Sequence, residues 1–400
     1  YDGRRRWVLH SGRIEGERTE EIRPIVEQTV AWFEQPIAVV RDQSKACKAA
    51  AKPLATAGIP DLVCHFHVLK NLGTRLLRRR YRHFKARWDR RLRVGARLEE
   101  LLRGLRDGRT NAHQQLAAAV LWVRQGPPAT SPSFPFRLLA LEQFDRLIAL
   151  QHQLGAFVDL RRSRAVADEM ESLQRVISEV GSDADLAALQ AEIRQRHQLF
   201  EEVRAVLRMV DPTNDQQPPL PGLQQQQIRE IEEDVSKYRS MLAGRIDTAS
   251  GHHRAALKTV LDALDRVKGQ LFGHPVIRDS KGEPTFVVDR TNNVIEHFFS
   301  RQNQAIRRQT GRKNLGRDLD DLPAEAALVH NLAQPSYVRT VVGSLDQLPA
   351  RFANLQPLPG PLRPRPLRPL LRRIKVVRAQ LAGSGHTPNS QRKPASPTAS

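Results

Sequence analysis

The spacing of hydrophobic and polar positions divides the chain into a short mixed region and a long helical one. Residues 36–40 form a continuous apolar run of the kind found in strands buried on both faces, and residues 61–67 form a second short strand that leads into a helix. Residues 7–15 alternate loosely, as in a strand, whereas residues 19–33 and 45–57 carry apolar side chains at helical spacing. This succession of strands and helices predicts a mixed α/β sheet.

From residue 68 onward the pattern changes to long, charged helices. Tyr81, Phe84 and Trp88 are spaced three and four apart, so they share one helical face while basic residues occupy the rest of the surface. Further helices are predicted at residues 112–125, 137–160, 164–180, 183–210, 223–243, 250–271 and 324–332. We therefore expect an all-helical block through the middle of the chain, with the last of these helices beyond it.

The end of the chain has a third character. Turn-forming residues at 279–282 lie between two short apolar runs and predict a small hairpin. A helix capped by Thr291 or Asn292 follows it. From residue 356 the chain is rich in proline and basic residues, so we expect a largely disordered tail with a short helix at residues 369–381.

The charge balance is strongly basic, with 64 lysine and arginine residues against 43 aspartate and glutamate residues in a chain of 400. The formal net charge of +21 favours a polyanionic partner. Nucleic acid is the first expectation, and an anionic membrane surface is the alternative. The imbalance is greatest within residues 70–100, which hold twelve basic and three acidic residues, more than solubility requires.

Two further features of the sequence bear on location. The chain has neither an apolar run of about 18 residues nor an apolar secretory segment at its start, so we expect no membrane span. Cys47 and Cys64 are its two cysteines, which excludes a disulfide framework and agrees with a reducing compartment. We therefore expect a cytoplasmic, nucleoid-associated protein. The absence of an initial methionine indicates an N-terminus further upstream.

Three places in the sequence carry candidate chemistry. Asp42 directly follows a buried strand, where α/β sheets expose ligand-binding groups, although Asp is also a common turn former. Cys64 and His67 suit either a zinc site or a local feature of a strand end, and the second ligand pair that structural zinc requires is not evident. Glu296 lies in a first helical turn, which the helix dipole favours in any case. What distinguishes Glu296 is the basic stretch after it, which holds no acidic residue before Asp318.

Three stretches carry a resemblance to a known family. They are Ala38-Val39-Val40-Arg41-Asp42-Gln43, Cys64-His65-Phe66-His67 with Lys70-Asn71, and Arg290-Thr291-Asn292-Asn293-Val294-Ile295-Glu296 with the Arg-rich helix and Gly311-Arg312. In order and spacing they resemble the DDE transposases with an RNase H-like catalytic domain, in particular the Mutator-like and related bacterial insertion-sequence enzymes. The resemblance covers about residues 1–335.

The resemblance implies a fold and a domain organisation. The fold is a helix-rich α/β one, in which an RNase H-like mixed sheet is interrupted by a large all-α insertion. The implied parts are residues 1–69, the N-terminally truncated start of the catalytic domain; 70–275, the helical insertion; 276–335, the closing part with the Glu-bearing helix; and 336–400, the basic tail.

The chemistry that the resemblance implies is DNA strand cleavage and strand transfer at the ends of a mobile element. Two Mg²⁺ ions would be bound by Asp42 and Glu296, which would act as metal ligands and catalytic residues. Cys64, His67, Asn292 and Asn293 are the other matching motif positions. DNA, which a homo-oligomer would bind, is expected to contact Arg78, Arg79, Arg82, Arg301, Arg307, Arg308, Arg312 and Lys313.

The sequence departs from the family at its start. The family's first catalytic Asp lies on the first strand of the sheet, and Asp2 is the one Asp ahead of Asp42. We expect the first strand, its Asp and any N-terminal DNA-binding domain to lie outside this chain, with Asp2 as the alternative first Asp. An active enzyme and a truncated, inactive copy both stay open. The competing hypothesis is a non-catalytic, basic nucleic-acid-binding protein. A membrane-surface protein ranks last, since Tyr81, Phe84 and Trp88 supply only a short apolar stripe.

Overall fold

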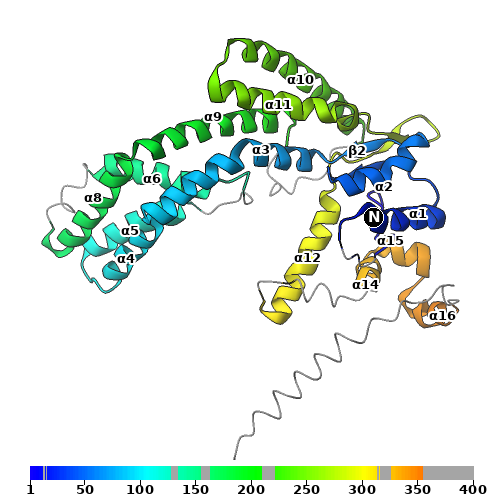
Figure 1. Cartoon of the computed structure of the whole chain (residues 1–400). Coiled ribbons are helices and arrows are strands. Elements are labelled where there is room, and N and C mark those ends of the chain that lie inside the picture. Colours follow the sequence, from blue (N-terminus) through cyan, green and yellow to red (C-terminus); the bar gives the residue numbers. More distant parts are fainter. Residues whose placement is uncertain are drawn as a thin grey trace, which may run out of the picture. The chain divides into compact units, whose positions relative to one another are not determined.

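A computed structural model of the chain describes residues 1–11, 14, 16–127, 134–154, 163–209, 221–312, 315 and 326–354 (Figure 1). Of these residues 73% are helical. Contacts divide the chain into two units, Tyr1–Tyr337 and Val338–Ser400. Among the helices within the described ranges, none has the length and apolar character that crossing a bilayer requires.

The first unit opens with two helices and two short strands. These are α1 (Thr19–Phe33), β1 (Val39–Arg41), α2 (Lys45–Thr56) and β2 (Asp61–Val63). The strands pair in parallel, with Val39 opposite Asp61 and Arg41 opposite Val63. The Ser44 hydroxyl accepts the backbone N–H of Cys47 and so caps α2. The three helices predicted in this region are confirmed. The two predicted strands are present but shorter: β1 begins only at Val39, and His65–His67, predicted as part of the second strand, belong to α3 (His65–Ala86).

The predicted RNase H-like mixed sheet is wrong. The described residues contain two sheets of two strands each: β1 with β2, and the antiparallel pair β3 (Val276–Arg278) with β4 (Pro284–Val287). The strand predicted at residues 7–15 is replaced, where it is described, by one isolated bridge between Asp2 and Trp7. The reason is visible at Val8. Its backbone N–H and C=O pair with the side-chain amide of Asn331, at 2.8 and 2.9 Å, rather than with a neighbouring strand.

The predicted helical block is confirmed. It consists of α3 (His65–Ala86), the π-helical turn η1 (Arg87–Arg91), α4 (Val94–Arg106), α5 (Asn111–Gln125), α6 (Leu139–Leu154), the 3₁₀ turn η2 (Arg164–Val166), α8 (Ala167–Gly181), α9 (Ala184–Val206), α10 (Pro221–Thr248) and α11 (Gly251–Leu271). The basic stretch at residues 70–100 is not one helix, because η1 separates α3 from α4. Residues 155–160 of the predicted helix 137–160 lie outside the described ranges.

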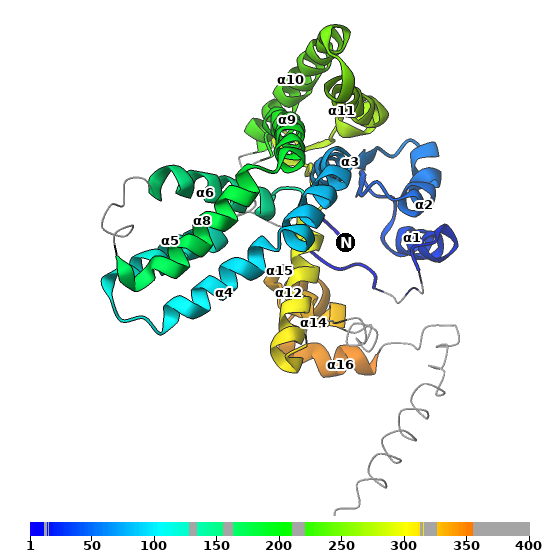
Figure 2. The same cartoon turned by 60° about the vertical axis from the view of Figure 1, so that its left-hand side comes forward.

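Helices α3 and α9 pack against each other along the block (Figures 1 and 2). Leu69, Leu72, Leu76 and Phe84 are buried on α3, so its apolar stripe faces the block and leaves the basic residues outside. Helices α4, α5, α6 and α8 gather at the far end of α3, and α11 packs near its start (Figure 1).

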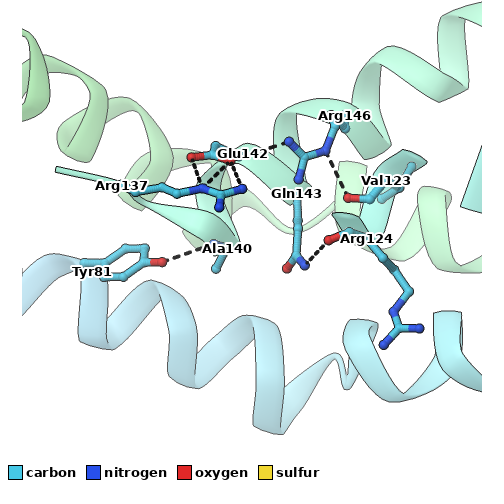
Figure 3. Close-up of polar contacts among 8 residues, drawn as sticks. All are labelled: Tyr81, Val123, Arg124, Arg137, Ala140, Glu142, Gln143 and Arg146. Carbon is cyan, nitrogen blue, oxygen red and sulfur yellow. Dashed lines mark hydrogen bonds and ion pairs between the residues drawn. The ribbon is translucent and has the colours of Figure 1, made fainter. Parts of the chain in front are cut away.

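Polar side chains complete the junction of α5 with α6, where helix ends would otherwise leave backbone groups unpaired (Figure 3). Gln143 and Arg146 donate to the carbonyls of Arg124 and Val123 at the end of α5, at 2.9 and 3.0 Å. The Tyr81 hydroxyl of α3 accepts the N–H of Ala140 in the first turn of α6. These bonds pair the backbone groups at the helix ends, although Nη2 of Arg146 is buried without a partner among the described residues.

In the described part of the chain, the first unit closes with helices α12 (Asn293–Thr310), α14 (Ala326–Leu332) and α15 (Pro335–Tyr337). Gly311 ends α12 in the left-handed conformation, with φ of 66°, and its N–H donates to the Arg307 carbonyl. The hairpin and the predicted helices at 291 and 324–332 are therefore confirmed. The second unit contains η3 (Val338–Val342), η4 (Leu345–Gln347) and α16 (Leu348–Ala353); the predicted tail from residue 356 lies outside the described residues.

Replacing Gly73 by Ala tests the packing of α3 on α9. A methyl group there would lie 2.6 Å from Pro135 Cγ and 2.7 Å from Phe200 Cε2. Because both contacts are shorter than van der Waals distance, we expect Gly73→Ala to lower the free energy of unfolding by about 1 to 3 kcal/mol in urea titrations. Gly244→Ala inside α10 is the control. Its methyl meets nothing within 4 Å, so it should raise stability by up to about 1 kcal/mol. Equal effects of the two substitutions would contradict close packing at Gly73.

Candidate functional site

Three segments distant in sequence meet where β2 runs into α3. The Cys64 N–H donates to the Arg41 carbonyl at 2.8 Å, which extends the strand pairing by one residue. The His65 N–H donates to the carbonyl of Arg290 at 3.0 Å, and the Asn292 N–H donates to Cys64 Sγ at 3.4 Å. The end of β1 and the segment ahead of α12 therefore both lie against the first turn of α3.

Glu296 lies in the first turn of α12 and faces the first turn of α3. Its Oε1 is 3.7 Å from Nε2 of His67. The Glu296 side chain is 52% exposed and that of His67 is 16% exposed, so the carboxylate is held on one side and open to solvent on the other. The Nδ1 of His67 and the Oδ1 of Asn292 are buried and have no hydrogen-bond partner among the residues described. Asn293 begins α12.

Asp42 follows β1 and reaches α3 through its neighbour. The side chain of Asn71 donates to Gln43 Oε1 at 2.7 Å. His67 and Asn71 are four residues apart on α3, so they share a face. One face of α3 therefore contacts both Glu296, through His67, and the residue next to Asp42, through Asn71. The Asp42 carboxylate itself accepts the Ser44 N–H at 2.8 Å, as an ordinary turn former does.

A buried ion pair fixes the strand ends beneath this face. Arg41 donates from Nε and Nη2 to the two carboxylate oxygens of Asp61, at 2.7 and 2.8 Å, and from Nη1 to the Asp42 carbonyl at 2.8 Å. Arg41 is 7% exposed, and Gln270 of α11 donates a further hydrogen bond to Asp61. Because two parallel bonds fix both position and orientation, this pair holds the backbone of Asp42 in place.

Sequence reasoning missed Arg41 and Asp61 as a functional pair, together with His65 and Arg290 as contacting residues. A signal for the first pair was present: a basic residue ends one short apolar strand and an acidic residue begins the next. Opposite charges on neighbouring strands favour pairing. No comparable local signal joins His65 to Arg290.

The predicted cofactor fits this site in ligand type but not in ligand number. Asp42 and Glu296 offer the carboxylate oxygens that Mg²⁺ prefers. Yet within the described ranges no group of three or more histidine, cysteine, aspartate or glutamate residues is arranged to hold a metal ion. The same finding gives no support to zinc at Cys64 and His67. The described residues therefore do not build a two-cation centre, and the Asp42 carboxylate reaches this face only through its neighbour Gln43.

The predicted DNA-contacting residues lie on two helices that begin at this site. Arg78, Arg79 and Arg82 are exposed on α3 and pair with no carboxylate among the described residues. Arg301, Arg307, Arg308 and Arg312 are exposed on α12 or just after it. Lys313 lies outside the described residues. Figure 1 shows α3 and α12 leaving the junction in different directions.

Comparison of the chain with protein-family models, with curated proteins and with solved structures finds no match in any of the three.

Breaking the Arg41–Asp61 pair tests its role as the support of the site. Asp61→Asn leaves the guanidinium of Arg41 buried without its counter-charge, so we expect a loss of about 3 kcal/mol in the free energy of unfolding, measured by urea titration. Glu171→Gln is the matched control. It breaks the pair of Glu171 with Arg175, whose side chains are 71% and 60% exposed, and should cost less than about 1 kcal/mol. A small effect at Asp61 would show that water reaches the pair.

Proposed function

We propose that this chain acts on DNA as a transposase, cleaving and joining strands at the ends of a mobile element. The observation that carries the proposal is the shared face of α3, where His67 contacts Glu296 and Asn71 contacts the neighbour of Asp42. These are the acidic residues and motif positions that the family resemblance singles out. Such a gathering of acidic segments from distant parts of the chain supports chemistry at this face.

The electrostatics of the face suit an anionic substrate held by a cation. Glu296 lies at the N-terminus of α12 and next to the N-terminus of α3, and both helix ends carry partial positive charge. Mg²⁺ is part of the proposal: when bound, it would stabilise the charge that develops at the reacting phosphate, with oxygens from Asp42 and Glu296. In the protein itself, His67 orients Glu296, and the Arg41–Asp61 pair fixes the backbone of Asp42.

The basic residues of α3 and α12 provide the DNA-binding surface of the proposal. Arg78 to Arg82 lie 11 to 15 residues beyond His67, which is about 16 to 22 Å along the α3 axis. Arg301 to Arg308 lie 5 to 12 residues beyond Glu296, which is about 8 to 18 Å along α12. The two sets of arginines therefore lie about one to four helical turns beyond His67 or Glu296. An oligomer on DNA remains a prediction.

A specific observation favours the alternative, a non-catalytic DNA-binding protein. The Asp42 carboxylate accepts the Ser44 N–H, a role that needs no chemistry, and a first-turn Glu stabilises any helix. In that case the basic helices would bind DNA while both acidic residues remain structural. Strand cleavage and DNA binding must therefore be measured separately.

Substitution of the two acidic residues separates these functions. We expect Glu296→Gln and Asp42→Asn each to lower Mg²⁺-dependent nicking of duplex DNA by about 100-fold or more, the scale for loss of one preorganised charged group, with unchanged DNA affinity. Nicking is followed on supercoiled plasmid. Glu233→Gln, an exposed position on α10, is the control and should behave as the unsubstituted chain. Tight DNA binding without any Mg²⁺-dependent nicking would establish the alternative function.

The salt dependence of DNA binding tests the basic surface. If Arg78, Arg79 and Arg82 contact phosphates, each single change to Ala should reduce the slope of log affinity against log salt by about 0.9. Fluorescence anisotropy on a labelled duplex at several salt concentrations gives the slope. Arg97→Ala is the control, because Arg97 is already paired with Glu179 at 2.5 Å and should leave the slope unchanged. If the Arg78, Arg79 and Arg82 variants all keep the slope of the unsubstituted chain, α3 does not contact the phosphates.

A further inference from the structure

A buried histidine and an arginine lie behind the candidate site. The His65 side chain is completely buried in the first turn of α3. Its Nε2 is 2.7 Å from the carbonyl of Leu271, the last residue of α11, and its Nδ1 is 3.4 Å from Nη1 of Arg290. The same Nη1 donates to the carbonyl of Leu207, which ends α9, at 2.8 Å. Arg290 therefore joins the ends of α9 and α11 to the start of α3.

The chemistry of the pair fixes where the histidine proton lies. A guanidinium has only donors, so Nδ1 of His65 must accept from Arg290. The proton is then on Nε2, which donates to the Leu271 carbonyl. Burial, reinforced by the positive charge of Arg290, lowers the pKa of His65 to about 3. His65 is therefore neutral at physiological pH, and its ring connects Arg290 to the Leu271 carbonyl by one hydrogen bond on each side.

The buried charge of Arg290 is balanced by helix ends rather than by a contacting carboxylate. The C-terminal carbonyls of a helix lack intrahelical partners and carry partial negative charge. Two such ends face Arg290: Leu207 directly, and Leu271 through His65. The neighbouring Asp289 side chain is instead hydrogen-bonded by Gln224 of α10 at 3.3 Å, and burial raises the pKa of that carboxyl.

We infer that Arg290 is a positioning residue for Glu296, because it ties the segment that begins α12 to the ends of α9 and α11. The backbone supports this. The Arg290 carbonyl accepts the His65 N–H, and two residues later the Asn292 N–H donates to Cys64. Glu296 follows within the next helical turn and contacts His67 on the same first turn of α3. The effect of Arg290 on catalysis rests on the proposed function. Its effect on the order of the segment around residues 291–299 does not.

The structural consequence is tested by hydrogen exchange. Arg290→Met keeps an unbranched side chain of similar length and removes every donor. We expect amide exchange in peptides covering residues 291–299 and 64–68 to accelerate by about tenfold or more, while α4 to α6 remain as protected as before. Arg175→Met is the control, because it removes an exposed pair with Glu171 on α8 and contacts neither His65 nor Arg290. Unchanged exchange at 291–299 in Arg290→Met would overturn the inference.

The catalytic consequence is tested on the same variants. We expect the nicking rate constant at saturating DNA to fall by about 10- to 100-fold in Arg290→Met, with DNA affinity unchanged, since small displacements of a catalytic group are costly. Arg290→Lys retains the charge and, on one nitrogen, three N–H donors, so it should recover part of the exchange protection and of the nicking rate constant. It replaces the Met variant if that variant does not fold. Faster exchange with an unchanged rate constant would overturn the positioning role. A chain that never nicks DNA, yet shows the exchange effect, refutes the proposed function and keeps the structural part.

Discussion

Helix ends that would otherwise carry unpaired backbone groups meet at one place in this protein, and their mutual satisfaction holds the candidate site together. The carbonyls that end α9 and α11 receive donors from Arg290 and His65, while the first N–H of α3 donates to the Arg290 carbonyl. Each of these groups would cost about 1 to 3 kcal/mol if buried without a partner. Separating α12 from the helical block would therefore expose several groups at once, not a single contact.

The two acidic residues proposed for catalysis are held in place by residues that have no catalytic role. Beneath Asp42 lies the buried Arg41–Asp61 pair, which Gln270 of α11 also contacts. Beneath Glu296 lies the chain segment held by Arg290. Both sets of contacts include the C-terminal part of α11: Gln270 contacts Asp61, and the Leu271 carbonyl pairs with His65, which contacts Arg290. Charges fixed by such a layer need little reorganisation when a substrate binds.

The periodicity of the sequence was sufficient for the helices and insufficient for the sheet. Buried positions such as Leu69, Leu72 and Leu76 recur at helical spacing. A helix can therefore be predicted from its own residues alone. A sheet depends on partners elsewhere. The loose alternation after Trp7 predicts a strand, but Val8 is paired by Asn331, a side chain that no local pattern could identify. The same limit hid Arg290, whose partners are His65 of α3 and Leu207 at the end of α9. Asp42 and Glu296 could be found locally, since one follows an apolar strand and the other precedes a basic stretch.

The position of Glu296 bears on which of the two functions the protein has. A half-exposed carboxylate at the start of a basic surface stabilises its own helix, but it repels phosphates at close range. His67 offsets that repulsion only when protonated. A divalent cation between the carboxylate and a phosphate would turn repulsion into attraction. Backbone contacts of Arg290 and Cys64 fix the segment that begins α12, so Glu296 starts beside the first turn of α3. The proposed transposase would use this carboxylate to bind the cation, whereas in a non-catalytic binder the same residue would contribute only to helix stability.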